Sequence, residues 1–311
     1  MKVLITGESG FLGNIIAADL RLKSYVVRTL GRRVSDDFFY DFNSNLVPLI
    51  QESFDFVIHC AGRAHSLPLT KEDANKFFQI NVDGTRYLLD ALSNTPPKSF
   101  VFISTIAVYG VEKGEMIDEE SPNFAKDPYG LSKVRAEQLV KKWCMSHNVI
   151  CTILRLPLIA GENPPGNLNA MIEGIRKGYY FNISGGHSKK SIVLAQDVAN
   201  IIPKAASIGG VFNLTDRDHP SFSAISFVIA KELGRSKPKS IPYWLAHVMA
   251  RIGDFAGTYS PINSKKLDKL TSELTFDDSK AVEVLGWRPE SVVNGFKIGR
   301  KFDDTSVKDL S

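Results

Sequence analysis

The 311-residue sequence predicts an α/β fold, a doubly wound parallel sheet joined to a smaller, discontinuous C-terminal lobe. Three observations predict it. Short apolar runs alternate with longer segments of helical periodicity through the first half of the chain, which is typical of a parallel sheet covered by helices on both faces. A glycine-rich turn follows the first apolar run. From Gly161 onward, the turn-rich stretch 162–167 ends the alternation.

The elements follow from this alternation in chain order. The predicted strands are Lys2–Thr6, Tyr25–Leu30, Phe54–Cys60, Ser99–Ser104 and Ile150–Leu156. The predicted helices, which follow the first, third and fourth strands, are Phe11–Leu22, Asn75–Ser93 and Tyr129–His147. Two later runs, Ser191–Leu194 and Val211–Leu214, are candidates to complete the same sheet. Right-handed crossovers would then gather ligands at the carboxyl ends of the strands.

The composition is that of an ordinary soluble globular protein, with 43% hydrophobic and 23% charged residues. The net charge is only +4, and basic residues are scattered except at 32–33 and 189–190, so no nucleic-acid partner is indicated. The three cysteines are Cys60, Cys144 and Cys151. Their spacing predicts neither a disulfide framework nor a metal site and favours a reducing, cytoplasmic compartment. The first strand leaves no room for a signal peptide, and no apolar run reaches the roughly 20 residues that span a bilayer.

A glycine-rich turn joins the first predicted strand to the first predicted helix. Glycine permits a tight turn and close approach of a pyrophosphate, and a helix N-terminus offers free N–H groups and a positive dipole end. The spacing Gly-x-x-Gly-x-x-Gly differs from the usual dinucleotide fingerprint, and a turn without a ligand is the alternative. Its position after the first strand nevertheless predicts a dinucleotide cofactor on a Rossmann-type sheet. The expected contacts are Gly7, Gly10, Phe11, Leu12 and Gly13.

The end of the second strand bears on the choice between NAD and NADP. An acidic residue about 20 positions past the glycines would bind the ribose hydroxyls of NAD. Gly31 takes that place and Arg32 follows it, so a guanidinium that can pair with a 2′-phosphate is present. This favours NADP over NAD, with a solvated Arg32 as the alternative. Two weaker candidates for the cofactor site are Asp41-Phe42, as a cap on the adenine, and Ala61-Gly62, as a small-residue wall.

A tyrosine and a lysine share one face of the predicted helix 129–147. Tyr129 and Lys133 are four residues apart. A phenol with a pKa near 10 transfers protons poorly at neutral pH, and a nearby ammonium lowers that pKa. Thr105, at the end of the preceding strand, is the candidate to hold a substrate oxygen while Tyr129 moves the proton. An exposed helix pair is the alternative, but the order of glycine turn, hydroxyl-ending strand and tyrosine helix favours catalysis.

In this order the motifs resemble the extended short-chain dehydrogenases of the NAD-dependent epimerase/dehydratase type. The matching segments are Thr6 to Gly13, His59 to Gly62, Asn81 to Thr85, Ser104 to Gly110, Tyr129 to Lys133, Arg155 to Pro157 and Leu285 to Pro289. They extend over nearly the whole chain. The resemblance implies a nicotinamide cofactor that transfers hydride, a nucleotide-linked sugar as substrate, and Thr105, Tyr129 and Lys133 as the catalytic set.

Departures from the family narrow the expected reaction. The family's 4,6-dehydratases carry an Asp-Glu pair directly after the catalytic threonine, where this chain has Ile106-Ala107, which cannot transfer protons. A 4-epimerase retains NAD tightly, whereas Gly31-Arg32 is typical of an exchangeable NADP site. The resemblance therefore implies a reductase of the 4-keto group of a nucleotide-linked 6-deoxy-sugar. Two alternatives stay open: a nucleotide-sugar 4-epimerase with tightly bound NAD, and a non-catalytic regulator that senses NADP.

We expect residues 1–159 plus 191–215 to form the dinucleotide-binding domain, and 160–190 plus 216–311 to form the substrate-binding lobe. Within that lobe, segments 167–172 and 185–193 are similar to bacterial reductases of UDP-linked 4-keto-6-deoxy-N-acetylhexosamines. This resemblance implies Asn167 and Lys190 as substrate contacts, Lys190 at the diphosphate, although both can equally be solvated loop residues. It also makes a homodimer through paired helices an expectation.

The stretch Tyr243–Ile252 is rich in aromatic and apolar residues at helical spacing. This pattern predicts a core helix rather than a membrane anchor. Peripheral membrane association through an amphipathic helix is an open alternative.

Overall fold

The computed structural model describes residues 1–64, 68–255 and 262–299. Their central feature is a seven-stranded sheet in the order β11-β7-β5-β4-β1-β2-β3, with every neighbouring pair parallel. Its strands are β1 (Lys2–Thr6), β2 (Val26–Gly31), β3 (Phe38–Phe39), β4 (Phe56–His59), β5 (Ser99–Thr105), β7 (Ile150–Leu156) and β11 (Gly210–Asn213). The doubly wound parallel sheet that the sequence predicts is confirmed.

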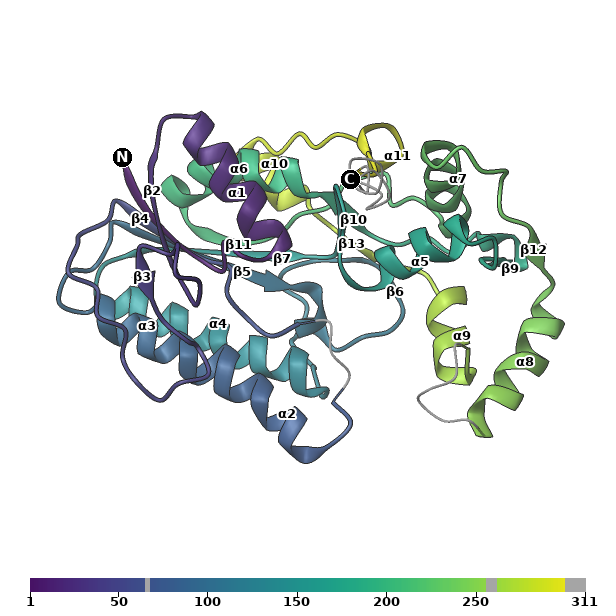
Figure 1. Ribbon diagram of the computed structural model, residues 1–311, viewed down its shortest axis with the longest axis horizontal. Coiled ribbons are helices and arrows are strands. Elements are labelled where there is room, and N and C mark those ends of the chain that lie inside the picture. The colour runs from purple at the N-terminus through teal and green to yellow at the C-terminus, as the bar shows by residue number, and fades with distance from the viewer. Residues whose placement is uncertain (65–67, 256–261, 300–311) are drawn as a thin grey trace, which may run out of the picture.

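Helices cover both faces of this sheet (Figure 1). One face carries α1 (Phe11–Leu22), α6 (Ala195–Ile208) and α10 (Ser279–Leu285). The other carries α2 (Lys71–Phe78), a π-helical turn (Gln79–Asp83), α3 (Gly84–Leu92) and α4 (Pro128–Ser146), while a 3₁₀ turn (Ile106–Tyr109) follows β5. The central strands β1 and β4 are buried between these layers, which is why their sequences are mostly apolar.

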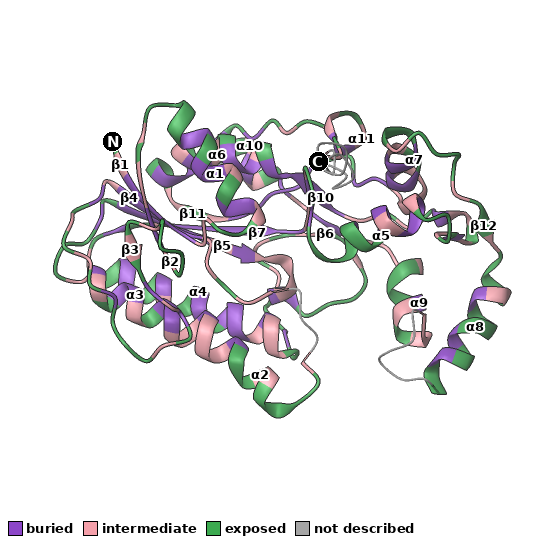
Figure 2. Ribbon diagram, in the orientation of Figure 1, coloured by how far each residue is buried: buried purple, intermediate pink, exposed green. Residues whose placement is uncertain are grey.

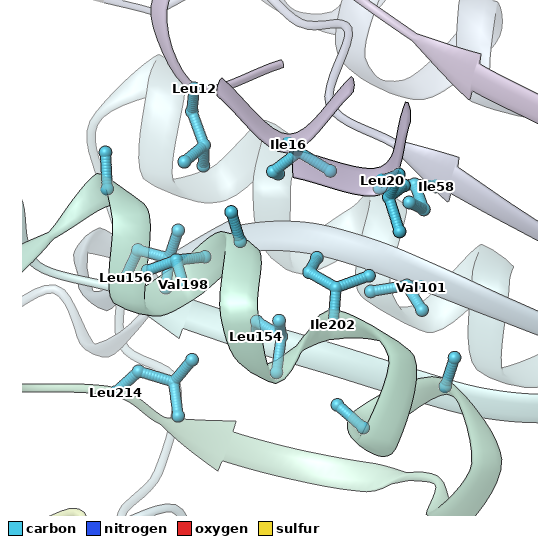
Figure 3. Close-up of a cluster of buried hydrophobic side chains, with 14 of the residues drawn as sticks. Leu12, Ile16, Leu20, Ile58, Val101, Leu154, Leu156, Val198, Ile202 and Leu214 are labelled. Carbon is cyan, nitrogen blue, oxygen red and sulfur yellow. The ribbon is translucent and has the colours of Figure 1, made fainter. Parts of the chain in front are cut away.

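The core on the α1 side shows how the sequence forms these layers (Figure 3). Leu12, Ile16 and Leu20 recur at four-residue spacing on α1 and pack against Val198 and Ile202 of α6. Each such fully buried aliphatic side chain contributes about 1.5–3 kcal/mol relative to an exposed one. This packing holds the first turn of α1 at a fixed place above the end of β1.

The remaining elements lie beyond one end of the large sheet (Figure 1). Three pairs of short strands are found there and along its border: β8 (Leu158–Ala160) with β10 (Ile192–Leu194), β9 (Asn182–Ile183) with β12 (Ser240–Ile241), and β6 (Gly114–Ile117) with β13 (Leu274–Phe276). The helices are α5 (Gly166–Arg176), α7 (Phe222–Glu232), α8 (Tyr243–Phe255), α9 (Ser264–Thr271) and α11 (Val292–Gly295), with a 3₁₀ turn at Ser184–Gly186. The exact division into two lobes stays a prediction.

The structure corrects one strand assignment. Val211–Leu214 does add to the large sheet, as β11 beside β7. Ser191–Leu194 does not, because β10 pairs with β8 in a separate two-stranded sheet. Pro157 separates β7 from β8, and a proline has no N–H for a sheet ladder. The chain therefore leaves the large sheet at that residue, and β10 pairs with the strand that has left.

The helix predicted at Asn75–Ser93 is longer at its start and irregular in its middle. It begins at Lys71, where Thr70 caps it by accepting a hydrogen bond from the Asp73 amide at 3.1 Å. The helical chain then widens into the π-helical turn before α3. Periodicity alone shows neither the cap nor the widened turn, and the second of these positions a site residue described below.

The prediction that Tyr243–Ile252 is a core helix was wrong for one of its faces. Trp244 and Ile252 are each 67% exposed, and Phe255 at the end of α8 is 94% exposed. The buried residues of α8 are small: Ala246, Ala250 and Gly253. The spacing correctly predicts a helix with two different faces. The face that packs against the protein is the one with small residues, and the face with large apolar residues is exposed. In the part of the chain that the structure describes, no helix is long and apolar enough to cross a membrane.

Candidate active site

The strand order reverses between β1 and β4. The chain proceeds outward from β1 to β2 and β3, then returns to β4 on the other side of β1. In doubly wound sheets such a reversal opens a crevice at the carboxyl ends of the two strands, where ligands bind. The glycine turn that follows β1 and the pair Ala61-Gly62 that follows β4 both lie at this crevice.

The glycine turn has no room for side chains. Gly7 has a φ of +74°, and a Cβ there would lie 2.6 Å from the backbone nitrogen of Ala61. A Cβ on Gly13 would collide with the carbonyl oxygen of Gly7. Gly10 is the N-cap of α1, donates a 2.9 Å hydrogen bond to the Gly7 carbonyl, and offers no side chain to cap the helix. A bare helix N-terminus behind a side-chain-free turn fits the pyrophosphate of a dinucleotide.

The other residues predicted in this turn face inward. Leu12 is buried in the core beneath α1, and the Phe11 ring lies against Gly161, whose Cβ would be 2.9 Å from it. Both therefore offer only their backbone N–H groups to a ligand. That Phe11 and Leu12 contact the cofactor through these N–H groups stays a prediction.

A buried histidine connects the ends of β1 and β4. His59 Nδ1 lies 2.6 Å from the Thr6 hydroxyl, which accepts a hydrogen bond from the Ala61 amide at 3.1 Å. His59 Nε2 lies 2.9 Å from the hydroxyl of Thr85. Burial, assisted by the charge of Lys133, lowers the pKa of His59 to about 3, so the ring is neutral at physiological pH. His59 thus fixes the crevice in place without carrying a charge.

Asn81 ties the loop after β4 to the start of α4. Its side-chain oxygen accepts from the Arg63 amide at 2.7 Å, and its side-chain nitrogen donates to the Ser132 hydroxyl at 2.9 Å. That hydroxyl in turn donates to the carbonyl of Tyr129 at 2.7 Å. Asn81 lies in the π-helical turn, an irregularity that is frequent at functional sites. Asn81 therefore has a structural role beside the site.

The structure brings Thr105 and Tyr129 together. Thr105 ends β5, and its hydroxyl accepts from the Ala107 amide at 3.2 Å. The same hydroxyl lies near enough to the phenol of Tyr129 to lower the pKa of that phenol. Asp127 caps α4 by accepting from the Gly130 amide at 3.0 Å, which fixes the first turn that carries Tyr129. Burial raises the pKa of the phenol, and the Thr105 hydroxyl opposes that rise only in part. Tyr129 is therefore protonated at neutral pH and able to donate.

Lys133 lies one turn further along α4 and is buried. Its ammonium donates a 2.7 Å hydrogen bond to the Ile103 carbonyl and lies 4.0 Å from the centre of the Phe102 ring. Burial lowers the pKa of Lys133 to about 8. We expected this ammonium to lower the pKa of Tyr129, and that expectation is corrected here. The tyrosine pKa is raised, because burial outweighs the groups around it.

A buried ion pair anchors the same helix face, and sequence reasoning missed it. Glu137, one turn beyond Lys133, pairs with Arg155 at 2.9 Å, and both side chains are only 2% exposed. The Ser104 hydroxyl donates to Glu137 at 2.5 Å, and Arg155 donates to the Tyr109 hydroxyl at 3.0 Å. Tyr109 in turn donates to Asn213 of β11 at 2.8 Å. The network joins α4 to three strands, and the four-residue spacing of 129, 133 and 137 was the available signal.

The end of β2 holds a carboxylate that the sequence did not reveal. A Cβ on Gly31 would lie 2.5 Å from Oδ2 of Asp36, which accepts from the Arg33 amide at 2.8 Å. The Arg33 guanidinium pairs with Glu8 of the glycine turn at 3.3 Å, while Arg32 is exposed. The turn 33–36 thus brings an acid back to the place that Gly31 leaves open. The prediction of NADP rested in part on the absence of a carboxylate there.

Asp41 and Phe42 lie on the β3 side of the crevice. The Phe42 ring is buried and stacks on His59 with ring centres 5.4 Å apart. The Asp41 carboxylate accepts from the Asn43 amide at 2.9 Å. A role for Asp41 and Phe42 at the adenine stays a prediction, and Phe42 would contribute through its backbone.

The pair Ala61-Gly62 lies on the β4 side of the crevice. A Cβ on Gly62 would lie 3.1 Å from the Asn81 side-chain oxygen, so the chain is tightly packed there.

The two predicted substrate contacts come from the C-terminal lobe. Asn167 is exposed in the first turn of α5. Lys190 is half-buried, and burial together with the positive charge of Lys269 lowers its pKa to about 8. An anion that binds near both ammonium groups would offset the repulsion between them, so this pair of lysines is suited to binding a phosphate. The structure does not place either residue in the hydrogen-bond network around Thr105 and Tyr129.

More than half of the chain matches a known protein family. The model of the NAD dependent epimerase/dehydratase family matches residues 3–214. The chain belongs to this family. The match includes the glycine turn, Thr105, Tyr129 and Lys133, and membership supports a nicotinamide cofactor.

Individual relatives are distant but cover nearly the whole length. UDP-glucose 4-epimerase of Vibrio cholerae is 26% identical, over 95% of this chain and 93% of the relative. The structure of UDP-glucose 4-epimerase of Thermus thermophilus with NAD aligns with a TM-score of 0.69 and 21% identity, covering 93% and 94% of the two chains. RMD of Pseudomonas aeruginosa with NADPH aligns at 0.71 and 20%, covering 94% and 96%. These structural similarities show the fold alone.

Proposed function

We propose that this protein is a reductase of the 4-keto group of a nucleotide-linked 6-deoxy-sugar, with a UDP-linked sugar as substrate and NADP as its preferred cofactor. The observation that carries the proposal is a Tyr129 phenol that burial keeps protonated, beside the Thr105 hydroxyl at the end of β5. A ketone oxygen held by one hydroxyl and facing a protonated phenol receives the proton it needs on becoming an alcohol.

Each residue then has a stated task. The glycine turn and the N-terminus of α1 would hold the pyrophosphate, and the nicotinamide, when bound, supplies hydride to the sugar C4. Thr105 donates a hydrogen bond to the ketone oxygen, and Tyr129 transfers its phenolic proton to that oxygen. Lys133, one turn further along α4, would hold the ribose of the cofactor, and the phenolate that remains takes its proton back from solvent. Asn81, Asp127 and Glu137 position these groups.

Dehydration is disfavoured at this site. Ile106 and Ala107 are half-buried where the family's dehydratases carry their acid and base. A non-catalytic NADP sensor is disfavoured because it has no use for Thr105, Tyr129 and Lys133. A 4-epimerase that retains NAD is the second candidate, and it is favoured by the Asp36 carboxylate at Gly31, where the ribose hydroxyls of NAD would find an acceptor.

Asp36 and Arg32 are expected to affect cofactor choice in opposite directions. Removing the carboxylate in Asp36→Asn removes repulsion of a 2′-phosphate, so the preference for NADPH over NADH should rise about tenfold. Arg32→Ala should lower that preference by a similar factor. The measurement is the dissociation constant of each reduced cofactor from nicotinamide fluorescence, which needs no turnover. Lys98→Ala, far from this turn, serves as the control, and unchanged ratios in both site variants would contradict the assignment.

The catalytic lysine predicts a pH dependence. The pKa of Lys133, about 8, lies below its ordinary value of 10.5, so the ammonium is charged below pH 8 and loses its charge as the pH rises through that value. We expect kcat/KM, which reports on the free enzyme, to fall by about tenfold per pH unit above this point. Lys190 has a similar pKa, so Lys133→Arg, which stays charged, separates the two. A decline that persists unchanged in Lys133→Arg would assign it to another group.

The remaining contacts concern the sugar nucleotide. We propose that Lys190, with Lys269 close by, meets the diphosphate and that Asn167 contacts the nucleotide. The nucleotide itself, the homodimer and the cytoplasmic location rest on the sequence argument and stay proposals.

The state of the cofactor in the purified protein tests the reductase against the epimerase. A reductase exchanges its cofactor at every turnover, so dialysis should leave little nucleotide, and added NADPH should bind and be displaced by NADP. About one NAD per chain that survives dialysis, together with interconversion of UDP-glucose and UDP-galactose without added cofactor, would replace the proposal by 4-epimerisation.

A further inference from the structure

An exposed apolar stripe extends along α8. Trp244, Val248, Ile252 and Phe255 are between 50% and 94% exposed. At 100° per residue they lie within one narrow sector of the helix, opposite the small residues that pack against α9. Figure 2 shows α8 at the edge of the molecule, away from the large sheet, with exposed residues along its length. Four exposed apolar side chains on one face of a peripheral helix point to an interaction surface.

A basic cavity lies just before this helix in the chain. It has a volume of about 340 Å³ and is formed by the segments 175–181 and 235–239. Five of its lining residues are cationic: Arg176, Lys177, Arg235, Lys237 and Lys239. Of these, Arg176 pairs with Glu173, while Arg235, Lys237 and Lys239 are exposed. A concave cluster of cations attracts phosphate groups.

The segment 231–255, which includes α8 and one wall of the cavity, is basic. It contains five Lys and Arg against two Asp and Glu, a net charge of +3, whereas the whole chain carries +4. The rest of the protein is therefore close to neutral. On α8 itself the acid, Asp254, already accepts two hydrogen bonds from Ser264. The stripe and the surrounding cations together have the two properties of a helix that lies in a membrane interface.

We propose that α8 and the basic cavity form a docking surface for an anionic lipid bilayer. The apolar stripe would enter the boundary between headgroups and acyl chains, and the cations of 235–239 would meet lipid phosphates. At 13 residues, α8 lies in the plane of the membrane and does not span it. Trp244, in the first turn of α8, would lie at the boundary between headgroups and acyl chains, where indole rings are enriched in membrane proteins.

Charge decides between a bilayer and a second copy of this chain. A twofold interface brings the same patch of both subunits together, so a dimer through α8 would place two surfaces of like charge against each other. An anionic bilayer offers the opposite charge over a wide, flat area and accepts apolar side chains beneath it. The observations therefore favour the bilayer.

The experiment measures binding to vesicles of phosphatidylcholine alone and of phosphatidylcholine with phosphatidylglycerol, using the full chain. Trp143 and Trp287 are buried, with 8% and 2% exposure, whereas Trp244 is 67% exposed. Insertion should therefore shift the tryptophan emission to shorter wavelength through Trp244. We expect this shift and co-sedimentation with the anionic vesicles only, and both should weaken as sodium chloride is added.

Matched variants separate the two parts of the surface. Trp244→Ser should abolish the emission shift, and Ile252→Ser and the pair Lys237→Glu, Lys239→Glu should each weaken vesicle binding by at least about tenfold. Leu22→Ser, which also removes an exposed apolar side chain, and Lys142→Glu, which also reverses an exposed charge, should bind as the unchanged protein does. All variants should keep their NADPH affinity and melting temperature.

Three results would overturn the proposal. One is the absence of co-sedimentation with anionic vesicles at low salt. Another is equal binding to neutral and anionic vesicles. The third is a mass of two chains in solution, measured by sedimentation, that falls to one chain in Trp244→Ser, which would assign the stripe to a second copy of this protein.

Discussion

Replacing Tyr129 with phenylalanine is expected to lower kcat by about a thousandfold, the effect typical of removing a general acid, while the affinity for NADPH stays nearly unchanged. The phenol hydroxyl is the group that Thr105 contacts and that burial keeps protonated. The ring itself is held by packing, because its centre lies 5.9 Å from that of Phe77, and a phenylalanine keeps that contact. Only the proton donor is lost.

Turnover with NADPH and fluorescence titration of the cofactor measure the two quantities separately. Tyr179→Phe, which removes a hydroxyl from a tyrosine that is 62% exposed, is the control and should behave as the unchanged protein. Thr105→Val should also lower kcat, whereas Thr105→Ser retains the hydroxyl and should preserve much of it. If Tyr129→Phe keeps more than about a tenth of the turnover, the phenol is not the proton donor that general acid catalysis requires.

Glu137→Ala is expected to destabilise the fold by about 3–5 kcal/mol, because it leaves the buried guanidinium of Arg155 without its carboxylate. Both side chains are only 2% exposed, so water cannot replace the lost partner. Urea unfolding monitored by circular dichroism gives the free energy. The matched control is Asp83→Ala, which breaks a pair with Arg86 that is about half exposed and should change stability by less than about 1 kcal/mol.

A double variant shows whether the loss of stability comes from losing the ion pair itself or from leaving the Arg155 charge buried without a partner. In Glu137→Met with Arg155→Met both charges are gone, and apolar side chains of similar size occupy the site, so much of the stability should return. A loss below about 1 kcal/mol in Glu137→Ala would show that the pair does not stabilise the fold as buried pairs do.

The sequence predicted the large sheet well because its signals are local. The limits of β1, α1 and β7 agree residue for residue with the prediction. Each is a run with one clear period, bounded by glycine, proline or polar residues. The glycine turn and the Tyr129 helix were placed correctly for the same reason, since their chemistry depends on neighbours within one or two helical turns.

The features that the sequence did not reveal depend on the path of the chain in three dimensions. β10 has the pattern of a buried strand, but only the path of β8 decides that it pairs outside the large sheet. The periodicity of α8 predicts two faces without showing that Ala246 and Ala250 supply the buried one. Asp36 reaches Gly31 because the intervening chain turns back, which spacing along the sequence does not show.

The most direct test of the reductase assignment is the oxidation of NADPH and NADH with a UDP-linked 4-keto-6-deoxy-N-acetylhexosamine, followed by identification of the product. The account predicts consumption of one NADPH per sugar, faster than with NADH, and a product in which C4 carries a hydroxyl. Failure to consume either cofactor, with the substrate intact and cofactor binding demonstrated, would contradict the reductase assignment and leave the family, the fold and the cofactor site standing.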